Sequence, residues 1–336
     1  MVALYITSLA KGVGKTTVCA GLGKHLLNNG KKVGFFKPFI ADSKYSPSEG
    51  TDNDAAFLKH VFALEESLDI LCPSFNDESS LGSGIKEAYA RVSQGKDVVI
   101  IEGISDHNQA SQSIVEALDA KVIFVEGYSR ELLQAINNYK DFGERLIGVV
   151  LNKVPESRVE VIKSEIPTQL GKEGVTFLGV LPEDRTLYAI TTGELAEYVQ
   201  GEIVSFAEKS AELVENLMIG AMVVDPGPDY FGRKTNKAVL IRSGRPDMQL
   251  AALETSTRCL VLTGNTAPMP VVLNRAEEKN VPIILTGNDI NTVVTKIEDA
   301  LGESRFNQEN KLPKLVEILK QSFDFQTVYQ GLGLAG

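Results

Sequence analysis

The chain has 336 residues, of which 43% are hydrophobic and 23% charged, a composition typical of a folded soluble protein of about two domains. Thirty-four basic against forty-four acidic residues give a net charge of −10, which argues against a protein that binds nucleic-acid backbones. The N-terminus shows no cleavable signal, and no apolar segment approaches the ~20 residues that cross a bilayer. We therefore expect a cytoplasmic protein without nucleic-acid or membrane partners.

Apolar strands alternate with amphipathic helices over the first half of the chain, beginning with a strand at 4–7 and a helix at 16–29. Further strands are expected at 33–36, 98–101, 122–125, 147–151 and 176–181. The helices between them are expected near 54–64, 85–93, 109–118, 131–141 and 158–170. Because short apolar strands separated by helices form parallel sheets with both faces covered, this half predicts an α/β domain over residues 1–190.

A second, smaller α/β domain is expected over residues 191–336. A helix is expected from Thr192 to about Asn216, followed by the strand-like segment LMIGAMVV. Three short strands then each end at a hydroxyl–glycine pair and lead into a helix; they lie at 238–241, 260–262 and 283–285. This repetition predicts a parallel sheet with three similar turns on one edge. A final helix, Pro313 to Phe323, is expected to pack or to bind a partner.

The strongest chemical signal lies where the first strand turns into the first helix. A bound phosphate needs backbone N–H groups at a helix N-terminus and a lysine, and its Mg²⁺ needs a hydroxyl. The segment meets these needs and predicts a P-loop, whose residues are Lys11, Gly12, Val13, Gly14, Lys15, Thr16 and Thr17. The usual first glycine is absent: Leu9 stands in its place in the common spacing, and Ser8 does so in a spacing one residue longer. Lys11 either adds positive charge beside the phosphates or is solvated.

Two acidic positions are candidate Mg²⁺ ligands. Glu102 follows the apolar strand 98–101, at the end where nucleotide-binding sheets place a carboxylate near Mg²⁺. Asp52 or Asp54 begins a helix, and capping of that helix is the alternative role. These residues predict a metal site beside the P-loop.

The expected base contact follows the strand at 147–151. Asn152-Lys153 stands where a guanine-reading motif would lie, but Pro155 replaces the aspartate that accepts guanine's hydrogen-bond donors. We therefore expect ATP rather than GTP, with Asn152 at the base. A simple turn at Asn152-Lys153 is the alternative.

Six segments of the first half resemble dethiobiotin synthetase, in the same order along the chain. They are GVGKT (12–16), GFFKP (34–38), DNDA (52–55), IIEG (100–103), VLNKV (150–154) and LGVLPE (178–183). The resemblance covers roughly residues 1–185. It implies that Lys15 binds phosphates and that Lys37 lies at the reaction centre, where the synthetase forms and phosphorylates a carbamate. It also implies nucleotide and metal contacts, which are Asn152 and Pro182 for the nucleotide and Thr16, Asp54 and Glu102 for Mg²⁺.

The departures from the synthetase fall on its substrate side. The turn after Glu102 reads Ile104-Ser105-Asp106, where the synthetase has a glycine-rich turn. The loop after Pro38 reads Phe39-Ile40-Ala41-Asp42-Ser43 instead of a run of small residues. The phosphate side is therefore kept, while the diaminoacid side is altered.

The second half resembles a DRTGG domain through ENLMIGAMVVD (215–225) and RSGRPDMQLAALET (242–255), although the signature itself is matched only loosely. The pairing is similar to the N-terminal regulatory half of long phosphate acetyltransferases, without their catalytic half. Arg242 flanks the first glycine turn, and the turns predict a site for an anionic metabolite or nucleotide effector at Ser243, Gly244, Arg245, Thr263, Gly264, Thr286 and Gly287. The alternative is that the glycines only permit tight turns.

These features favour a regulatory or sensor protein that binds ATP and Mg²⁺, with weak ATPase activity as an option, and that forms a homo-oligomer. An ATP-dependent carboxylase or ligase is the rival hypothesis, and Lys37 beside Lys15 is the feature that favours it. A third hypothesis is a partner-binding ATPase that resembles the deviant-P-loop positioning proteins; Lys11 favours it, and the missing first glycine argues against it.

Overall fold

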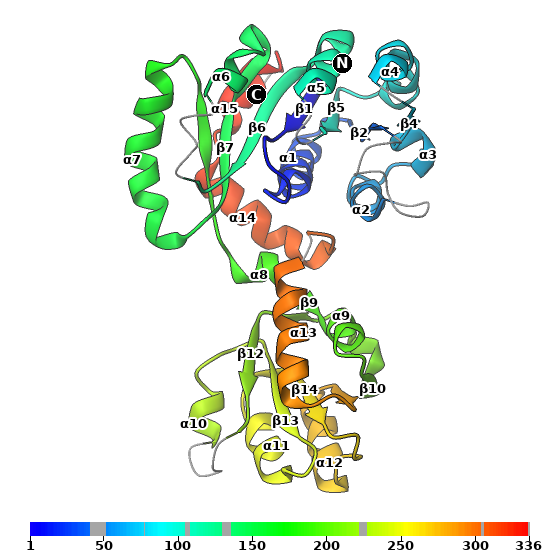
Figure 1. Cartoon of the computed structure of the whole chain (residues 1–336), viewed down its shortest axis with the longest axis vertical. Helices are drawn as coiled ribbons and strands as arrows, with labels where there is room; N and C mark the ends of the chain where they lie inside the picture. Colours follow the sequence, from blue (N-terminus) through cyan, green and yellow to red (C-terminus); the bar gives the residue numbers. More distant parts are fainter. Residues whose placement is uncertain are drawn as a thin grey trace. The chain divides into compact units, whose positions relative to one another are not determined.

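The computed structural model describes residues 1–40, 52–76, 78–104, 108–129, 136–221, 227–303 and 306–334. The chain divides into two units, each built on its own sheet (Figure 1). The first unit combines Met1–Glu183 with Phe306–Gly336, and the second is Asp184–Arg305.

A six-stranded sheet forms the centre of the first unit, with its strands in the order β2-β5-β1-β6-β7-β8. The strands are β1 (Val2–Thr7), β2 (Val33–Phe36), β5 (Val98–Glu102), β6 (Lys121–Gly127), β7 (Leu146–Val154) and β8 (Phe177–Pro182). Every neighbouring pair is parallel, so the carboxyl ends of all six strands lie at one edge. The expected parallel α/β fold is confirmed.

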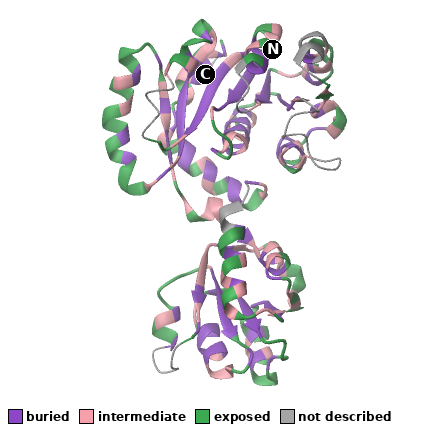
Figure 2. Cartoon of the chain, viewed as in Figure 1, coloured by how far each residue is buried: buried purple, intermediate pink, exposed green. Residues whose placement is uncertain are grey.

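Helices connect the strands of the first unit. They are α1 (Lys15–Asn28), α2 (Asn53–Val61), α3 (Leu68–Leu71), α4 (Glu78–Ser93), α5 (Asn108–Leu118), α6 (Ile136–Lys140), η2 (Gly143–Arg145) and α7 (Glu156–Lys172). A separate pair of short strands, β3 (Phe39–Ile40) and β4 (Ser74–Phe75), lies parallel. Figure 2 shows the central strands buried and α7 largely exposed on its outer side, which explains why the strands are almost entirely apolar. No helix in the described part of the chain is long and apolar enough to cross a membrane.

The second unit contains a five-stranded sheet in the order β10-β15-β14-β13-β12. The strands are β10 (Glu202–Ser205), β12 (Asn216–Ile219), β13 (Lys237–Arg242), β14 (Thr257–Thr263) and β15 (Ile283–Thr286). The last four are parallel, which confirms the three repeated strands, whereas β10 runs antiparallel to β15. A two-stranded sheet joins β9 (Ile190–Thr191) and β11 (Leu213–Val214).

The helices of the second unit follow its strands. They are α8 (Arg185–Tyr188), α9 (Thr192–Tyr198), η3 (Ala207–Lys209), α10 (Gly227–Phe231), α11 (Pro246–Leu253), α12 (Pro270–Lys279) and α13 (Ile290–Glu303). The turns after β13, β14 and β15 lie at the carboxyl edge of the sheet, because Arg242, Thr263 and Thr286 are register partners across the three strands.

The helix expected from Thr192 to Asn216 is wrong beyond Tyr198. Its start is capped by Thr191 and Glu194 in a reciprocal capping box, as polar residues there predict. Gln200 then takes a positive φ of 53°, and a side chain at Gly201 would lie 2.6 Å from Ile284. Chain direction therefore changes here, and the next residues form β10. Of the strand-like segment LMIGAMVV, the part from Met222 to Val224 lies outside the described residues.

The C-terminal segment belongs to the first unit, so the expected second domain of 191–336 is wrong at its C-terminal end. This segment contains η4 (Glu309–Lys311), α14 (Leu312–Ser322) and α15 (Phe325–Gly331). Helix α14 contacts α1 and β8 (Figure 1). The physical reason is its apolar face, since Leu315 and Leu319 are buried against Gly21 of α1. The division after Glu183 also precedes the boundary expected at 190.

Candidate nucleotide-binding site

The P-loop connects β1 to α1 and takes the backbone form that its glycines permit. Gly12 and Gly14 have φ values of 68° and 96°, which favour glycine. A Cβ at Gly14 would lie 2.1 Å from Nδ2 of Asn152, so this position excludes side chains for a second reason. Leu9 is not among the residues with positive φ, which explains why the first glycine of a usual P-loop is dispensable here.

Asn152 lies beneath the P-loop and is buried. Its Nδ2 donates a hydrogen bond to the carbonyl oxygen of Val13 at 2.9 Å. Its register partner on β6 is Gly127, where an added Cβ would lie 3.4 Å from a methyl group of Val13. The sequence placed Asn152 at the base of the nucleotide, and that contact stays a prediction. The contact with Val13 gives Asn152 a further role, which is to hold the loop.

Lys37 is the centre of a buried charge cluster formed from three elements. Its Nζ lies 2.9 Å from Asp52 Oδ2, 3.3 Å from Asp54 Oδ2 and 3.2 Å from Glu102 Oε1. The hydroxyl of Thr16, in the first turn of α1, donates to the same Glu102 oxygen at 3.2 Å. The structure therefore brings together five residues that were named from the sequence, from three distant parts of the first half and the P-loop.

Asp52 and Asp54 divide the two roles that the sequence left open. Asp52 is the N-cap of α2, and its Oδ1 accepts a hydrogen bond from the backbone N–H of Ala55 at 2.7 Å. Asp54 lies in the first turn and faces Lys37. Asp52 thus performs the capping role while also pairing with Lys37, and the metal role of Asp54 stays a prediction.

The charged groups of this cluster shift one another's pKa values. Burial alone would lower the pKa of Lys37, but Glu102, Asp54 and Asp52 raise it above the ordinary lysine value. Burial raises the pKa of Glu102, and the charge of Lys37 opposes that rise. Three carboxylates thus surround one ammonium group, which leaves a net attraction for a second cation.

The residues present fit Mg²⁺. Oε2 of Glu102 is buried and has no hydrogen-bond partner among the described residues, so a carboxylate oxygen is available beside the hydroxyl of Thr16. Magnesium prefers carboxylate and hydroxyl oxygens and keeps several waters. No group of three His, Cys, Asp or Glu side chains that could hold a metal occurs in the described part of the chain. The expected set, Thr16, Asp54 and Glu102, contains only two carboxylates and a hydroxyl.

The other residues expected to contact the nucleotide include Lys15, Lys11, Thr17 and Pro182. Nζ of Lys15 donates to the hydroxyl of Ser8 at 3.3 Å, so Lys15 lies over its own loop. Lys11 is exposed and Thr17 is buried. Pro182 ends β8, with its backbone opposite Val154 of β7. Its place at the nucleotide stays a prediction.

Sequence reasoning missed Glu126, which ends β6 on the side of β1 opposite to Glu102. Its Oε1 accepts a hydrogen bond from the backbone N–H of Leu9 at 3.1 Å. The available signal was an acidic residue at the end of an apolar strand, the same signal that selected Glu102. Ala41, Asp42, Ser43, Ser105 and Asp106, on the expected substrate side, lie outside the described residues.

The three glycine turns of the second unit lie together at one sheet edge, as expected. Nothing lies within 4 Å of a Cβ built at Gly244, Gly264 or Gly287, so the space over the turns is open. Two of the hydroxyls that precede these glycines are used within the fold. Ser243 Oγ donates to the Thr263 carbonyl oxygen at 2.7 Å, and Thr286 Oγ1 donates to that of Val199 at 2.8 Å.

The two arginines of the first turn differ in their surroundings. Arg245 forms an ion pair with Asp247 at 2.8 Å, and both its Nε and Nη2 donate to that carboxylate. Arg242 is exposed at the end of β13. Arg245 is thus held by a neighbour two residues away, whereas Arg242 is exposed; the effector contact of either arginine stays a prediction.

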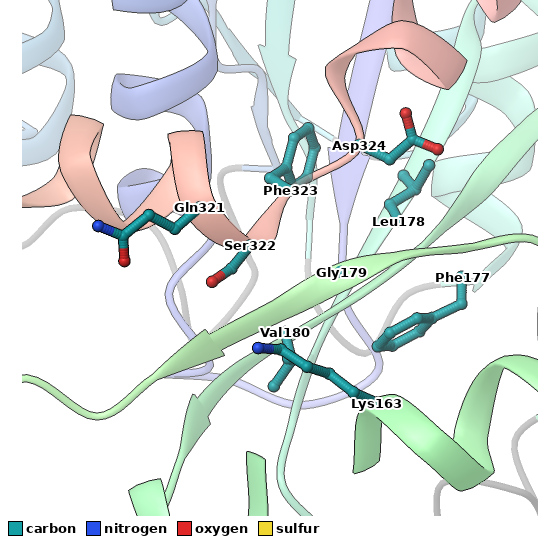
Figure 3. Close-up of a pocket in the computed structure, with 9 residues that line it drawn as sticks. All are labelled: Lys163, Phe177, Leu178, Gly179, Val180, Gln321, Ser322, Phe323 and Asp324. Carbon is teal, nitrogen blue, oxygen red and sulfur yellow. The ribbon is translucent and has the colours of Figure 1, made fainter. Parts of the chain in front are cut away.

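The first unit contains a pocket at its edge strand β8 (Figure 3). Its lining comes from β8, from Lys163 of α7 and from the segment Gln321–Asp324. The backbone N–H of Asp324 donates to the carbonyl oxygen of Leu178 at 2.7 Å, and Phe323 bridges to Gly179. The pocket therefore marks the place where the C-terminal segment lies against the edge strand, and none of the expected nucleotide residues lines it.

Comparison with known proteins gives relatives for both units. A sequence of 23% identity, the phosphate acetyltransferase of Pseudomonas aeruginosa, matches 98% of this chain and 52% of its own length. The ATP-dependent dethiobiotin synthetase BioD 2 of Escherichia coli is 27% identical over 58% of this chain and 91% of its own length. Among solved structures, the MinC:MinD cell division protein complex of Aquifex aeolicus matches 56% of this chain and 84% of its own, at 19% identity and a TM-score of 0.40.

The chain spans about half the length of the phosphate acetyltransferases that it matches, or less: 52% for P. aeruginosa and 37% for Nitrosomonas europaea. A family model described as a DRTGG domain matches residues 194–300. A second model, described as an AAA domain, matches residues 2–191, which is more than half of the chain and includes the P-loop, Lys37 and the carboxylate cluster. The chain therefore belongs to this AAA-domain family, with a DRTGG domain after the P-loop unit.

Proposed function

We propose that this protein is a regulatory Mg-ATP-binding protein, in which the first unit holds the nucleotide and the second unit holds an anionic effector. The observation that carries the proposal is the convergence of Thr16, Asp54 and Glu102 beside the P-loop. These residues come from α1, α2 and β5 and meet at the carboxyl edge of the sheet, where α/β proteins bind nucleotides.

In this proposal the P-loop holds the phosphates. The N-terminus of α1 and the backbone of Gly12–Gly14 face them with N–H groups, and Lys15 turns from Ser8 to their oxygens. Mg²⁺, held by Thr16 and by the carboxylates of Asp54 and Glu102, would neutralise phosphate charge. Adenine is favoured over guanine because Pro155 stands where guanine's aspartate would be.

The effector would lie over the glycine turns of the second unit. Helices α11, α12 and α13 follow these turns, so the N–H groups of their first turns after Pro246, Pro270 and Ile290 favour an anion. Arg242 supplies an exposed guanidinium, which suits phosphate or carboxylate. Arg245, expected beside the ligand from the sequence, would act only after leaving Asp247.

The route of regulation would be the C-terminal segment. It begins directly after the second unit and lies against both helices of the nucleotide site. The ring of Phe306 packs edge-on against Phe57 of α2, and Glu309 lies 3.1 Å from His60. Leu319 of α14 lies against Gly21 of α1. The start of the segment thus contacts α2, the helix that carries Asp54. Its later residue Leu319 contacts α1, the helix that carries Thr16.

A thermal-shift titration of the whole protein tests the two sites together, because a ligand that binds only the folded state raises its apparent stability. Wild type, Lys15→Ala and Arg242→Ala are titrated with Mg-ATP and with a panel of nucleotides and acidic metabolites. We expect Lys15→Ala to lose only the ATP shift and Arg242→Ala to lose only the effector shift. We also expect each ligand to change the affinity of the other by the same factor. A protein that responds to no nucleotide contradicts the proposal.

The second candidate function is an ATP-dependent carboxylase or ligase. Lys37 favours it, because a synthetase-like reaction needs a lysine beside the P-loop at the reaction centre. The synthetase relative is also matched over 91% of its length. The test is incubation with ATP, bicarbonate and diaminopelargonate. Ring closure at ~1 s⁻¹ or faster is an enzyme-like rate and would establish this candidate. Absence of turnover with intact ATP binding supports regulation.

A further inference from the structure

Glu126 holds the first residue of the P-loop. Its Oε1 accepts a hydrogen bond from the backbone N–H of Leu9 at 3.1 Å, across 117 residues of sequence. Leu9 occupies the position of the first glycine in a usual P-loop. The contact therefore joins the end of β6 to the point at which the chain leaves β1.

The surroundings of Glu126 suit a fixed acceptor. The side chain is buried, and burial raises its pKa to about 7, while the Leu9 N–H and the charge of Lys15 act in the opposite direction. Burial and the charge of Glu126 raise the pKa of Tyr139, whose hydroxyl is buried and has no hydrogen-bond partner among the described residues. A carboxylate oxygen and a neutral carboxyl oxygen both accept a hydrogen bond from an N–H, so Leu9 keeps its partner in either protonation state.

A second strand holds the loop further along. Asn152 of β7 donates to the carbonyl oxygen of Val13 at 2.9 Å, four residues after Leu9. The loop is thus attached at both ends, once through an N–H and once through a carbonyl group. Neither attachment uses an N–H group of Gly12 or Gly14, and these remain available to face phosphate oxygens.

We propose that Glu126 is a positioning residue of the nucleotide site, which fixes the start of the P-loop through Leu9 where the usual glycine is absent. The expected consequence of this positioning is tighter binding of Mg-ATP, and that consequence rests on the proposed function. The positioning itself is a property of the protein without nucleotide. The two parts are therefore measured separately.

The first measurement is hydrogen exchange at the Leu9 amide in the full chain without nucleotide. Glu126→Gln keeps an acceptor oxygen, whereas Glu126→Leu removes it at similar volume. Tyr139→Phe is the matched control, because it removes a buried hydroxyl that the charge of Glu126 influences and leaves the Leu9 contact in place. We expect Leu9 exchange to quicken about tenfold or more in Glu126→Leu, as for the loss of a hydrogen bond to a charged acceptor, and to stay close to wild type in the other two variants. Equal protection in wild type and Glu126→Leu overturns the proposal.

The second measurement is the calorimetric affinity of the same four proteins for Mg-ATP. We expect Glu126→Leu to bind at least about fivefold more weakly, with Glu126→Gln restored to within about twofold of wild type. Failure of Glu126→Gln to restore affinity overturns the positioning role, because charge rather than the Leu9 contact would then be responsible. A wild-type protein that does not bind Mg-ATP overturns the proposed function instead, while Leu9 exchange still decides whether Glu126 fixes the loop.

Discussion

The amide nitrogen of Asn152 lies 2.9 Å from the carbonyl oxygen of Val13 and thereby joins β7 to the P-loop across the intervening strand β6. Gly127 of β6 is the register partner of Asn152, and a Cβ built there would lie 3.4 Å from a methyl group of Val13, an ordinary contact distance. The residue that the sequence suggested as a base contact is thus also part of the support of the loop.

Replacing Asn152 with alanine should weaken Mg-ATP binding about two- to tenfold, since a buried hydrogen bond contributes about 0.5–1.5 kcal/mol. Asn29→Ala is the matched control, because Asn29 also donates from its amide to a backbone carbonyl, that of His25, but on the surface at the end of α1. Calorimetry of both variants checks the prediction. Equal affinities for Asn152→Ala and Asn29→Ala would show that the Val13 contact has no effect on binding.

Gly14→Ala should be more damaging than Gly12→Ala. Both positions have positive φ, which costs an alanine about 1–2 kcal/mol. At Gly14 the new methyl group would also lie 2.1 Å from Asn152, whereas nothing lies within 4 Å at Gly12. Urea unfolding of the two variants measures the difference. The double variant Gly14→Ala/Asn152→Ala should recover part of the loss, and an equal loss for both single variants would contradict the proposed clash.

Gly21→Ala should destabilise the first unit by about 1–3 kcal/mol through overpacking against α14. The added Cβ would lie 2.1 Å from a methyl carbon of Leu319. Leu319→Ala alone leaves a cavity, but the double variant should be more stable than the sum of the single losses predicts. Additive losses in urea unfolding would mean that α14 does not pack on α1 as described.

Lys37→Met should destabilise the protein by about 3 kcal/mol near neutral pH, because it leaves three carboxylates without their buried cation. The pKa of Lys37 lies above its ordinary value, so the lysine is charged and its contribution is present at all pH values below that ordinary value. In Lys37→Met, protonation of Glu102, whose pKa is raised by burial, relieves repulsion within the cluster as the pH falls. The loss of stability should therefore be larger at pH 8 than at pH 5. A loss that is independent of pH would contradict the charge cluster.

The strands and the P-loop could be predicted from the sequence because their signals are local. Apolar runs of four to six residues, such as VVII at 98–101, mark strands that are buried on both faces. The segment GVGKT lies between a strand and a helix, and that order is enough to predict a P-loop at this position. The acid at the end of a strand was a weaker signal, which selected Glu102 but was not applied to Glu126.

The remaining features depend on long-range packing. The apolar face of α14 fits any apolar surface, so nothing local indicates that it returns to α1 rather than staying with the second unit. The contact of Asn152 with Val13 joins β7 to the P-loop across β6, between residues that are 139 positions apart in the sequence. Arg245 has its acceptor two residues away, yet whether it pairs with Asp247 or with a ligand depends on how the turn places both side chains.

The central claim is that the first unit binds Mg-ATP through its P-loop, and calorimetric titration of wild type and Lys15→Ala with ATP tests it most directly, with and without Mg²⁺ and with GTP for comparison. We predict that wild type binds Mg-ATP more tightly than Mg-GTP and more tightly than ATP without metal. Lys15→Ala should bind at least about tenfold more weakly, since a charge-assisted contact contributes about 1.5–3 kcal/mol. Equal affinity of wild type and Lys15→Ala for Mg-ATP, or a preference for GTP, would contradict the account.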